Sequence, residues 1–433
     1  MNKFSVRLKV LSIFLLLTSE AIFSQLKIEI TEGIREPIRI AIVPFSQNSS
    51  STQKFKLHSI ITKDLESFGE FEAIKPEDML SYPSNQEEVF YRDWRLLKVN
   101  YLLIGSFEES EKDNEIKVSY NIFDISREKR LYTGLISSQS NSWRKLAHRI
   151  SDRFYQKING IPGIFTTRIA YIEEPKLQEE KYHLKVSDID GENNSLVFSS
   201  SQPLMSPDWS PDSKKLAYVS FENGFSQIFI QELASGKRQS IKSSGGINSS
   251  PSWSPNGRYI AAVLSKSGNP DIYIYDLNKN SWRQVTDHFG IDTEPTWSSN
   301  GKKILFTSNR SGSPQIYELT ISNGRIKRKT FEGSYNARGR YLPGGRHIAL
   351  IHRRKGLFHV AIQNIRNGNL KILTDTFLDE SPTISPNGNI IIYATKKNQR
   401  GILAGITVNN ITKFILPSIM GEVREPAWSP LVN

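Results

Sequence analysis

Residues that could act as nucleophiles, acids or metal ligands are present, but their spacing matches no known catalytic motif. The chain has no G-x-S-x-G nucleophile elbow, no phosphate-binding loop and no dinucleotide-binding glycine pattern. It contains no cysteine, which excludes thiol catalysis and zinc–thiolate sites. The sequence therefore predicts a protein with no catalytic residues, no cofactor and no metal.

Histidine is the other common metal ligand, and seven histidines occur: His58, His148, His183, His288, His347, His352 and His359. Those in the C-terminal part do not recur at one position of the repeat described below, as a ring of channel ligands would. His352 and His359 could share one repeat, but Arg353 and Arg354 disfavour a cation beside them.

The charge of the chain is mildly basic and unevenly spread. The formal net charge is +12. Between Arg325 and Lys355 ten lysines or arginines stand against one acid, Glu332. One interpretation is a patch for anionic partners such as lipid head groups or envelope polymers; the other is an ordinary solvated face. Binding of nucleic acid is a third interpretation, but the leader described next argues against it.

The first residues have the pattern of an export signal. Lys3, Arg7 and Lys9 precede a short apolar run from Val10 to Leu17, and Ala21 and Ser24 are small residues suited to cleavage. The run is too short to span a membrane, and no later segment approaches 18 consecutive apolar residues. We therefore expect residues 1–24 to be a signal peptide and the mature protein to be exported, without a membrane span.

Residues 25–160 alternate between strand-like and helix-like patterns. Residues 38–45 read "IRIAIVPF", a buried strand, and Leu57, Ile61, Leu65 and Phe68 form one stripe of a helix. Further helices are predicted at Phe90–Leu97 and from Trp143 to Ile158, the latter capped within 140–142. Strands are predicted at 101–107, 116–122 and 131–137. This alternation predicts an N-terminal α/β domain with a flexible leading segment at 25–36.

From residue 161 to residue 433 the sequence repeats itself. Trp209, Trp253 and Trp297 each lie in a version of "P-x-W-S", spaced by 44 residues. Tyr341, Ile384 and Trp428 continue the series at spacings of 44, 43 and 44. Each of the first five markers is followed by a turn such as "SPNG" and by three short strands. Four strands every 44 residues predict an all-β propeller.

The two ends of this region complete each other. A strand triplet starting at Arg168 precedes every marker, whereas the marker at Trp428 has no triplet after it. We therefore predict a six-bladed β-propeller of WD40-like repeats, closed by a C-terminal strand within "EPAWSP" at 425–430. Closure of this kind removes the open sheet edges.

These residues carry a specific resemblance. The segments "GIPGIFTTRIAYI" at 160–172, "QPLMSPDWSPDSKKLAYVSFENG" at 202–224, "DTEPTWSSNGKKILFTS" at 292–308, "TFLDESPTISPNG" at 376–388 and "GEVREPAWSP" at 421–430 resemble the TolB family of the Tol–Pal envelope system. The resemblance covers the whole chain. The repeat "NARGRYLPGG" at 336–345 departs from the family pattern, which puts in doubt any contact expected from that loop.

The resemblance implies a periplasmic, non-enzymatic interaction protein that supports envelope integrity and outer-membrane constriction at cell division. TolB-like proteins bind the peptidoglycan-associated lipoprotein Pal through the propeller, and the inner-membrane protein TolA through the mature N-terminus. The resemblance thus implies a monomer within a complex. The loops leading into the innermost strands should converge on one rim of the channel. The residues expected there to contact a Pal-like partner are Met205, Ser249, Thr293, Glu294, Arg338, Asp379, Glu380, Arg424 and Glu425.

The leading segment "QLKIEITEGIRE" at 25–36 alternates apolar and polar residues. Such a segment can add as a strand to a sheet edge of its own protein or of another. We expect it to bind a TolA-like protein through Leu26, Ile28, Ile30 and Ile34, and to switch between a docked and a free state. The alternative function is a propeller enzyme, a hydrolase or channel-metal lyase, that acts on an envelope or extracellular substrate.

Overall fold

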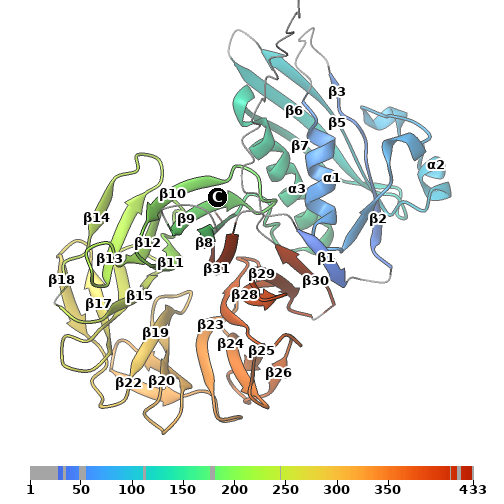
Figure 1. Cartoon of the computed structure of the whole chain (residues 1–433). Helices are drawn as coiled ribbons and strands as arrows, with labels where there is room; N and C mark the ends of the chain where they lie inside the picture. The colour runs from blue at the N-terminus through green and yellow to red at the C-terminus, as the bar shows by residue number, and fades with distance from the viewer. Residues whose placement is uncertain are drawn as a thin grey trace, which may run out of the picture.

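The computed structural model describes residues 28–32, 36–47, 55–110, 114–175, 181–243, 245–409, 411–416 and 421–431. The predicted signal peptide, and Leu26 and Ile34 of the leading segment, lie outside the described residues. Figure 1 shows an α/β domain beside a ring of small β-sheets, so the predicted fold class is confirmed.

The N-terminal domain contains one mixed sheet in the order β4-β2-β5-β6-β7, with β3 added to β5. Strand β2 pairs in parallel with β4 and β5, whereas β5, β6 and β7 are antiparallel. The apolar run at 38–45 explains why β2 is an interior strand, because both of its faces are covered. The strands are β2 (Ile38–Ile42), β3 (Ser46–Gln47), β4 (Phe71–Ala73), β5 (Tyr101–Ser110), β6 (Glu115–Asp124) and β7 (Lys129–Gln139).

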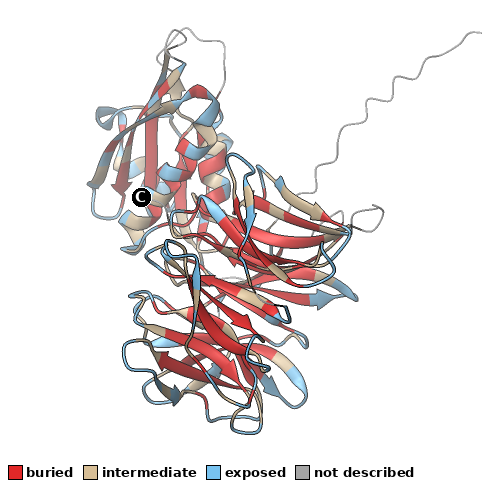
Figure 2. Cartoon of the chain, turned by 90° about the vertical axis from the view of Figure 1, so that its left-hand side faces the viewer, coloured by how far each residue is buried: buried red, intermediate tan, exposed pale blue. Residues whose placement is uncertain are grey.

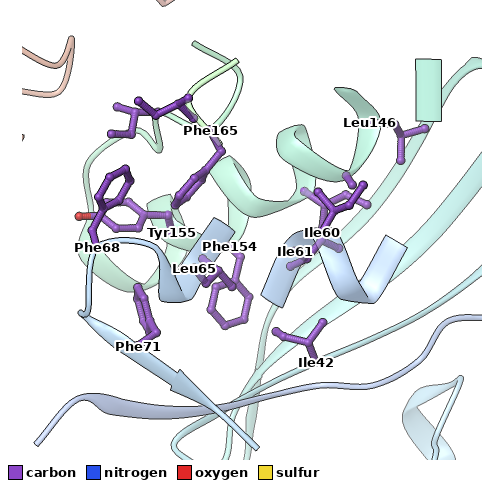
Figure 3. Packing of buried hydrophobic residues seen from close by; sticks show 14 of the residues in the cluster. Ile42, Ile60, Ile61, Leu65, Phe68, Phe71, Leu146, Phe154, Tyr155 and Phe165 are labelled. Carbon is purple, nitrogen blue, oxygen red and sulfur yellow. The ribbon is translucent and has the colours of Figure 1, made fainter. Parts of the chain in front are cut away.

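The helices cover the two faces of this sheet. The α-helices are α1 (Leu57–Glu66), α2 (Tyr91–Leu96) and α3 (Trp143–Asn159), and the short 3-10 helices are η1 (Pro76–Asp78), η2 (Gln86–Glu88) and η3 (Ser140–Ser142). Helices α1 and α3 pack together over one face, where Ile42, Ile61 and Phe154 meet (Figure 3). On the other face Trp94 of α2 packs in a second cluster with Phe123.

Two details of the predicted helices are wrong. Phe90 precedes α2 and is exposed, so it does not belong to the buried stripe. Ser142 does not cap α3 with its side chain, because its hydroxyl donates a hydrogen bond to Asn141 Oδ1 instead. No helix in the described part of the chain is both long and apolar enough to cross a membrane.

Six sheets follow one another around a ring, and we number these blades along the chain. Blade one contains β8 (Arg168–Pro175), β9 (Tyr182–Asp188), β10 (Ser195–Ser200) and β31 (Gly421–Trp428); blade two contains β11 (Leu204–Trp209), β12 (Lys215–Ser220), β13 (Gln227–Glu232) and β14 (Arg238–Ser240); blade three contains β15 (Asn248–Trp253), β16 (Tyr259–Leu264), β17 (Asp271–Asp276) and β18 (Ser281–Gln284).

The second half of the ring repeats the same order. Blade four contains β19 (Asp292–Trp297), β20 (Lys303–Ser308), β21 (Gln315–Thr320) and β22 (Arg325–Arg328); blade five contains β23 (Asn336–Tyr341), β24 (His347–Arg354), β25 (Leu357–Asn364) and β26 (Leu370–Ile372); blade six contains β27 (Glu380–Ile384), β28 (Ile390–Lys397), β29 (Arg400–Thr407), β30 (Lys413–Leu416) and, as a fifth strand, β1 (Glu29–Glu32). The two middle strands of each blade are largely buried and the outermost strands are more exposed (Figure 2).

The closure of the ring is as predicted. Strand β31 pairs antiparallel with β8, from Gly421 opposite Pro175 to Trp428 opposite Ile169. The last strand of the chain is therefore the innermost strand of the first blade. In the described residues, this pairing is what joins the two ends of the propeller sequence.

The two domains share one continuous apolar cluster. The ring of Phe68, just after α1, lies 5.4 Å from that of Phe414 in β30 and 6.1 Å from that of Phe165 in the connecting segment. Figure 3 shows Phe165 beside Tyr155 and Phe68. Asn387 of blade six also donates a hydrogen bond to the carbonyl of Pro162 (2.9 Å). The N-terminal domain is thus fixed to the side of the ring where blades one and six meet.

Gly405 of β29 allows Phe414 to reach this cluster. A Cβ atom at position 405 would lie only 2.0 Å from Phe414 Cζ. We expect Gly405→Ala to lower the free energy of unfolding by about 1–3 kcal/mol, because the ring must move out of a packed core. Gly245→Ala is the matched control, since nothing lies within 4 Å of its added Cβ. Chemical denaturation of both variants checks this, and equal stability of the two would contradict it.

Candidate interaction site at the mouth of the channel

The six innermost strands share a local distortion at one end of the channel. Each contains a bulge, and at each bulge a non-glycine residue has a positive φ of 50–56°: Ser206, Ser250, Glu294, Arg338, Ser381 and Glu425. A proline follows five of these residues, and Gly339 follows Arg338. Such a backbone is unfavourable for ordinary residues and is concentrated at functional sites. All six residues line the mouth of the channel.

The charged side chains of this ring contact one another across neighbouring blades. Arg338 Nε lies 3.0 Å from Glu294 Oε1, and the backbone N–H of Arg338 donates to Glu294 Oε2 (3.0 Å). The Arg338 guanidinium also donates to Ser381 Oγ, and Ser206 N donates to the Glu425 carboxylate. Burial alone lowers the pKa of Arg338, but nearby carboxylates, above all that of Glu294, raise it above its usual value. The mouth is therefore a fixed arrangement of opposite charges around a guanidinium.

Below this ring, three of the marker residues tie neighbouring blades together. The indole N–H of Trp209 donates to the carbonyl of Ala427 (2.9 Å), and that of Trp297 donates to the carbonyl of Ser252 (3.0 Å). The backbone N–H of Trp253 donates to Asp208 Oδ2 (2.7 Å). Burial raises the pKa of Asp208 to about 6. These contacts hold the walls of the channel and keep the bulges in register.

The structure brings together some of the residues predicted from sequence. Glu294, Arg338 and Glu425 line the mouth. Glu380 is exposed and adds its charge to the field at Arg338. Met205, Ser249 and Thr293 are half-buried and directly precede the bulge residues of their strands. Ser206, Ser250 and Ser381 also line the mouth but were not among the predicted residues. Each precedes a proline and recurs at the repeat spacing, and this signal could have indicated their position.

Two of the predicted residues have other contacts. Asp379 is only 2% exposed, and its carboxylate accepts hydrogen bonds from Thr376 Oγ1 (2.5 Å) and Thr395 Oγ1 (2.8 Å). This burial favours a role in shaping its loop over direct contact with a partner. Arg424 pairs with Glu174 (2.7 Å) on the adjacent strand β8. Its partner contact stays a prediction.

A group of exposed apolar residues surrounds the mouth, which sequence reasoning did not find. The loops that lead into the innermost strands lie at the same end of the blades as the hairpins between the second and third strands; for example, Asn269 donates hydrogen bonds to the carbonyls of His288 and Gly290 (2.7 Å each). We call this end of the propeller the mouth face. Its exposed large apolar residues are Phe225, Ile247, Phe289, Ile291, Phe331, Leu357, Phe377 and Leu378. Phe289 and Phe331 are 86% and 71% exposed. Such a surface marks a protein-binding site more often than chance.

The basic run at 325–355 does not form a single patch. Arg325 and Lys327 lie on the outermost strand of blade four, whereas Arg338 lies at the mouth. Arg346 is at the opposite end of blade five, in the turn before β24, and Arg354 ends that strand at the mouth face. The strands of one repeat run back and forth between the two ends of the propeller, so residues close in sequence are spread over the whole blade.

The leading segment docks on the edge of blade six. Strand β1 pairs with β30, with Ile30 opposite Phe414 and Glu32 opposite Lys413. Thr31 Oγ1 donates to the carbonyl of Lys413, and Lys413 Nζ lies 3.1 Å from Glu32 Oε2. All four residues of β1 are exposed, while Ile28 packs against the shared cluster. The segment is thus attached by few buried contacts.

A second polar cluster joins the two domains. His148 Nδ1 of α3 lies 2.8 Å from Asp64 Oδ2 of α1, and His148 Nε2 lies 3.8 Å from Asp190 Oδ2 in blade one. Their ligand atoms lie within 4.8 Å of one another, as a metal site would require, but Arg144 already binds Asp190 Oδ2 (2.6 Å). Ser151 donates to Asp64 (2.6 Å). A catalytic triad would need the serine on the imidazole, so this geometry does not form one.

This cluster predicts a pH dependence of stability. Burial raises the pKa of Asp64. Burial lowers that of His148, but the hydrogen bond and charge of Asp64 outweigh it, so the pKa of His148 is raised. The folded protein therefore binds protons here more tightly than the unfolded chain. For His148, this stabilisation is complete below about pH 6.5 and is lost as the pH rises through the folded pKa of that histidine.

We accordingly expect His148→Asn to flatten the decline in the free energy of unfolding above about pH 6.5. His347→Asn, at an exposed histidine, should keep the wild-type slope. Denaturation at a series of pH values measures this. A slope that is the same in His148→Asn and the wild type would contradict the assignment.

Comparison with known proteins gives the family. The model of the TolB amino-terminal domain matches residues 26–131, and that of the TolB beta propeller domain matches residues 155–432. The Tol-Pal system protein TolB of Hahella chejuensis is 57% identical over 97% of this chain and 98% of its own length. That of Alcanivorax borkumensis is 49% identical over 94% of each chain.

A solved structure agrees with these relatives. The crystal structure of TolB from Acinetobacter baumannii covers 94% of this chain and 100% of its own, with 39% identity and a TM-score of 0.86. Both domains, the closing strand and the sequence relatives lead to the same assignment. This chain belongs to the TolB family of the Tol–Pal system.

Proposed function

We propose that this protein is a periplasmic, non-enzymatic adaptor that binds a Pal-like lipoprotein on the mouth face of its propeller. The observation that carries the proposal is the combination at one end of the channel: exposed apolar side chains surround a fixed ring of charges. Protein interfaces draw affinity from aromatic anchors, and complementary charges set the orientation and rate of association. The N-terminal domain contacts the propeller at the turns after the innermost strands, for example at Asn387, and this is the end opposite the mouth face.

The second partner in this proposal is a TolA-like protein, bound by the leading segment. Strand β1 is exposed and adds to a sheet edge, so the same backbone groups could instead pair with an edge strand of a partner. Its docking on blade six connects the segment physically to the propeller. Occupation of the mouth face would then alter the balance between docked and free segment, which links the outer and inner membranes during constriction at division.

A pull-down of the tagged mature protein from a cross-linked envelope tests this function. We expect recovery of both a Pal-like lipoprotein and a TolA-like inner-membrane protein. Recovery of neither would overturn the proposal. The same preparation is suited to a hydrolase assay, because turnover of an envelope substrate would support the enzyme alternative instead.

A further inference from the structure

A second concave site lies between the two domains, away from the mouth. It has a volume of about 1000 Å³ and is lined by β7 and α3 of the N-terminal domain and by the turns of blades one and two. We call it the interdomain cleft. It is separate from the docking site of β1, which lies on blade six.

The interdomain cleft is rich in cations without acidic partners. Its lining cations are Arg144, Lys145, Arg149, Arg153, Arg168 and Lys214. Over the described residues, only Arg144 of these six forms an ion pair, with Asp190. The lining carboxylates are engaged elsewhere: Asp152 accepts from Phe165 N (2.7 Å), Asp188 from Asn193 (2.6 Å) and Asp212 from Ser210 (2.6 Å). The cleft is therefore suited to an anionic ligand.

Two buried nitrogens in its wall also lack hydrogen-bond partners. His148 is 2% exposed and lines the cleft, and its Nε2 has no hydrogen-bond partner among the described residues. The same holds for Arg144 Nε in that part of the structure. Buried donors of this kind are costly to leave unpaired. They are an independent indication that the cleft receives a ligand.

Strand β7 supplies the feature that identifies the class of ligand. It is the edge of the N-terminal sheet, and within the described ranges no strand pairs with its outer side. It is 11 residues long, and Leu135, which faces outward, is 80% exposed. The cations of α3 lie beside it: Arg153 Cζ is 5.3 Å and Lys157 Nζ is 4.7 Å from the centre of the Tyr132 ring. A long unpaired edge is a template for an added strand.

We propose that the interdomain cleft binds an extended acidic peptide of a partner protein, which adds to β7 as a further strand. Side chains of an added strand alternate between the two faces. One set would lie with Tyr132 on the side of α3 and place carboxylates against Arg149 and Arg153. The other set would lie with Leu135 and be apolar. The recognised pattern is thus an alternation of acidic and apolar residues.

The test uses the full mature protein and a synthetic 11-residue peptide that alternates glutamate and valine. We expect saturable binding, and slowed amide hydrogen exchange in β7 when the peptide is bound. Arg149→Glu with Arg153→Glu should weaken binding by about tenfold or more, because two charge-assisted contacts are lost. Lys279→Glu with Arg325→Glu, at exposed cations of the propeller, is the matched control and should bind like the wild type.

Several outcomes would overturn the proposal. One is that a peptide with lysine in place of each glutamate, or tripolyphosphate, binds as tightly as the acidic peptide. Another is binding that leaves amide exchange in β7 unchanged. A third is concentration-dependent dimerisation that the peptide does not displace, which would assign the edge to a second copy of this chain.

Discussion

Truncation of the chain before β31 is expected to abolish the folded propeller. Removal of residues 421–433 deletes the innermost strand of blade one, so β8 loses its partner and the ring loses its closure. Trp428 is buried; its indole N–H donates to Thr167 Oγ1 (2.8 Å) and its backbone N–H donates to Thr383 Oγ1 (2.9 Å). The last strand thus holds blades one and six together.

The single substitution Trp428→Ala tests the same strand with a smaller change. We expect a loss of about 3–5 kcal/mol in the free energy of unfolding, because a large buried side chain leaves a cavity. The matched control is Trp282→Ala on the outer strand β18, where the indole is half-buried and donates to the carbonyl of Lys242 (2.8 Å). Thermal and chemical denaturation of both variants measure the difference. An equal or smaller loss for Trp428→Ala would show that closure is not the critical contact.

Deletion of residues 25–36 is expected to abolish binding of a TolA-like protein, whereas a Pal-like lipoprotein should still bind. Strand β1 adds few buried contacts to blade six, so its loss should change the melting temperature little. Because the segment is the proposed binding element, no weaker site should remain.

Lys413→Ala is a second test of this prediction, because it is expected to strengthen binding of a TolA-like protein instead of abolishing it. Lys413 Nζ contacts both Glu32 (3.1 Å) and Asp375 (3.3 Å), and its removal should loosen the docked segment without deleting it. The free fraction would rise and the affinity for a TolA-like protein should increase by a few-fold. Titration calorimetry with the isolated partner domain measures both variants. Retained binding after deletion, or simultaneous loss of both partners, would refute the assignment.

The architecture of the propeller could be predicted because each blade is encoded locally. The spacing of Trp209, Trp253 and Trp297 fixed the period, and the unmatched marker at Trp428 predicted the closing strand. In the N-terminal domain, α1 could also be predicted from local sequence, because its apolar residues recur with a strong helical period. Helix α2 is short and its apolar pattern is weaker, so Phe90 was wrongly predicted to lie on its buried face.

The sites were harder to predict, because they depend on contacts distant in sequence. The repeat placed Glu294, Arg338 and Glu425 on one rim, since equivalent positions must converge. The exposed phenylalanines of the mouth face were missed, because an apolar residue in a loop has no sequence pattern that separates it from a core residue. His148 and Asp64 are 84 positions apart, and their pairing depends on the packing of α1 against α3. Likewise β7 becomes an edge only through the strand order of the whole sheet.

The most direct test of the central claim is the affinity of the mouth face for the soluble domain of a Pal-like lipoprotein. Phe289→Asp with Phe331→Asp changes two exposed rings and should leave the fold intact. Calorimetry should show affinity weakened by about 100-fold or more, because aromatic anchors dominate such interfaces. Leu96→Asp, at an exposed leucine of α2, is the control and should bind like the wild type. Wild-type affinity in the double variant would contradict the assignment of the mouth face as the Pal-like site.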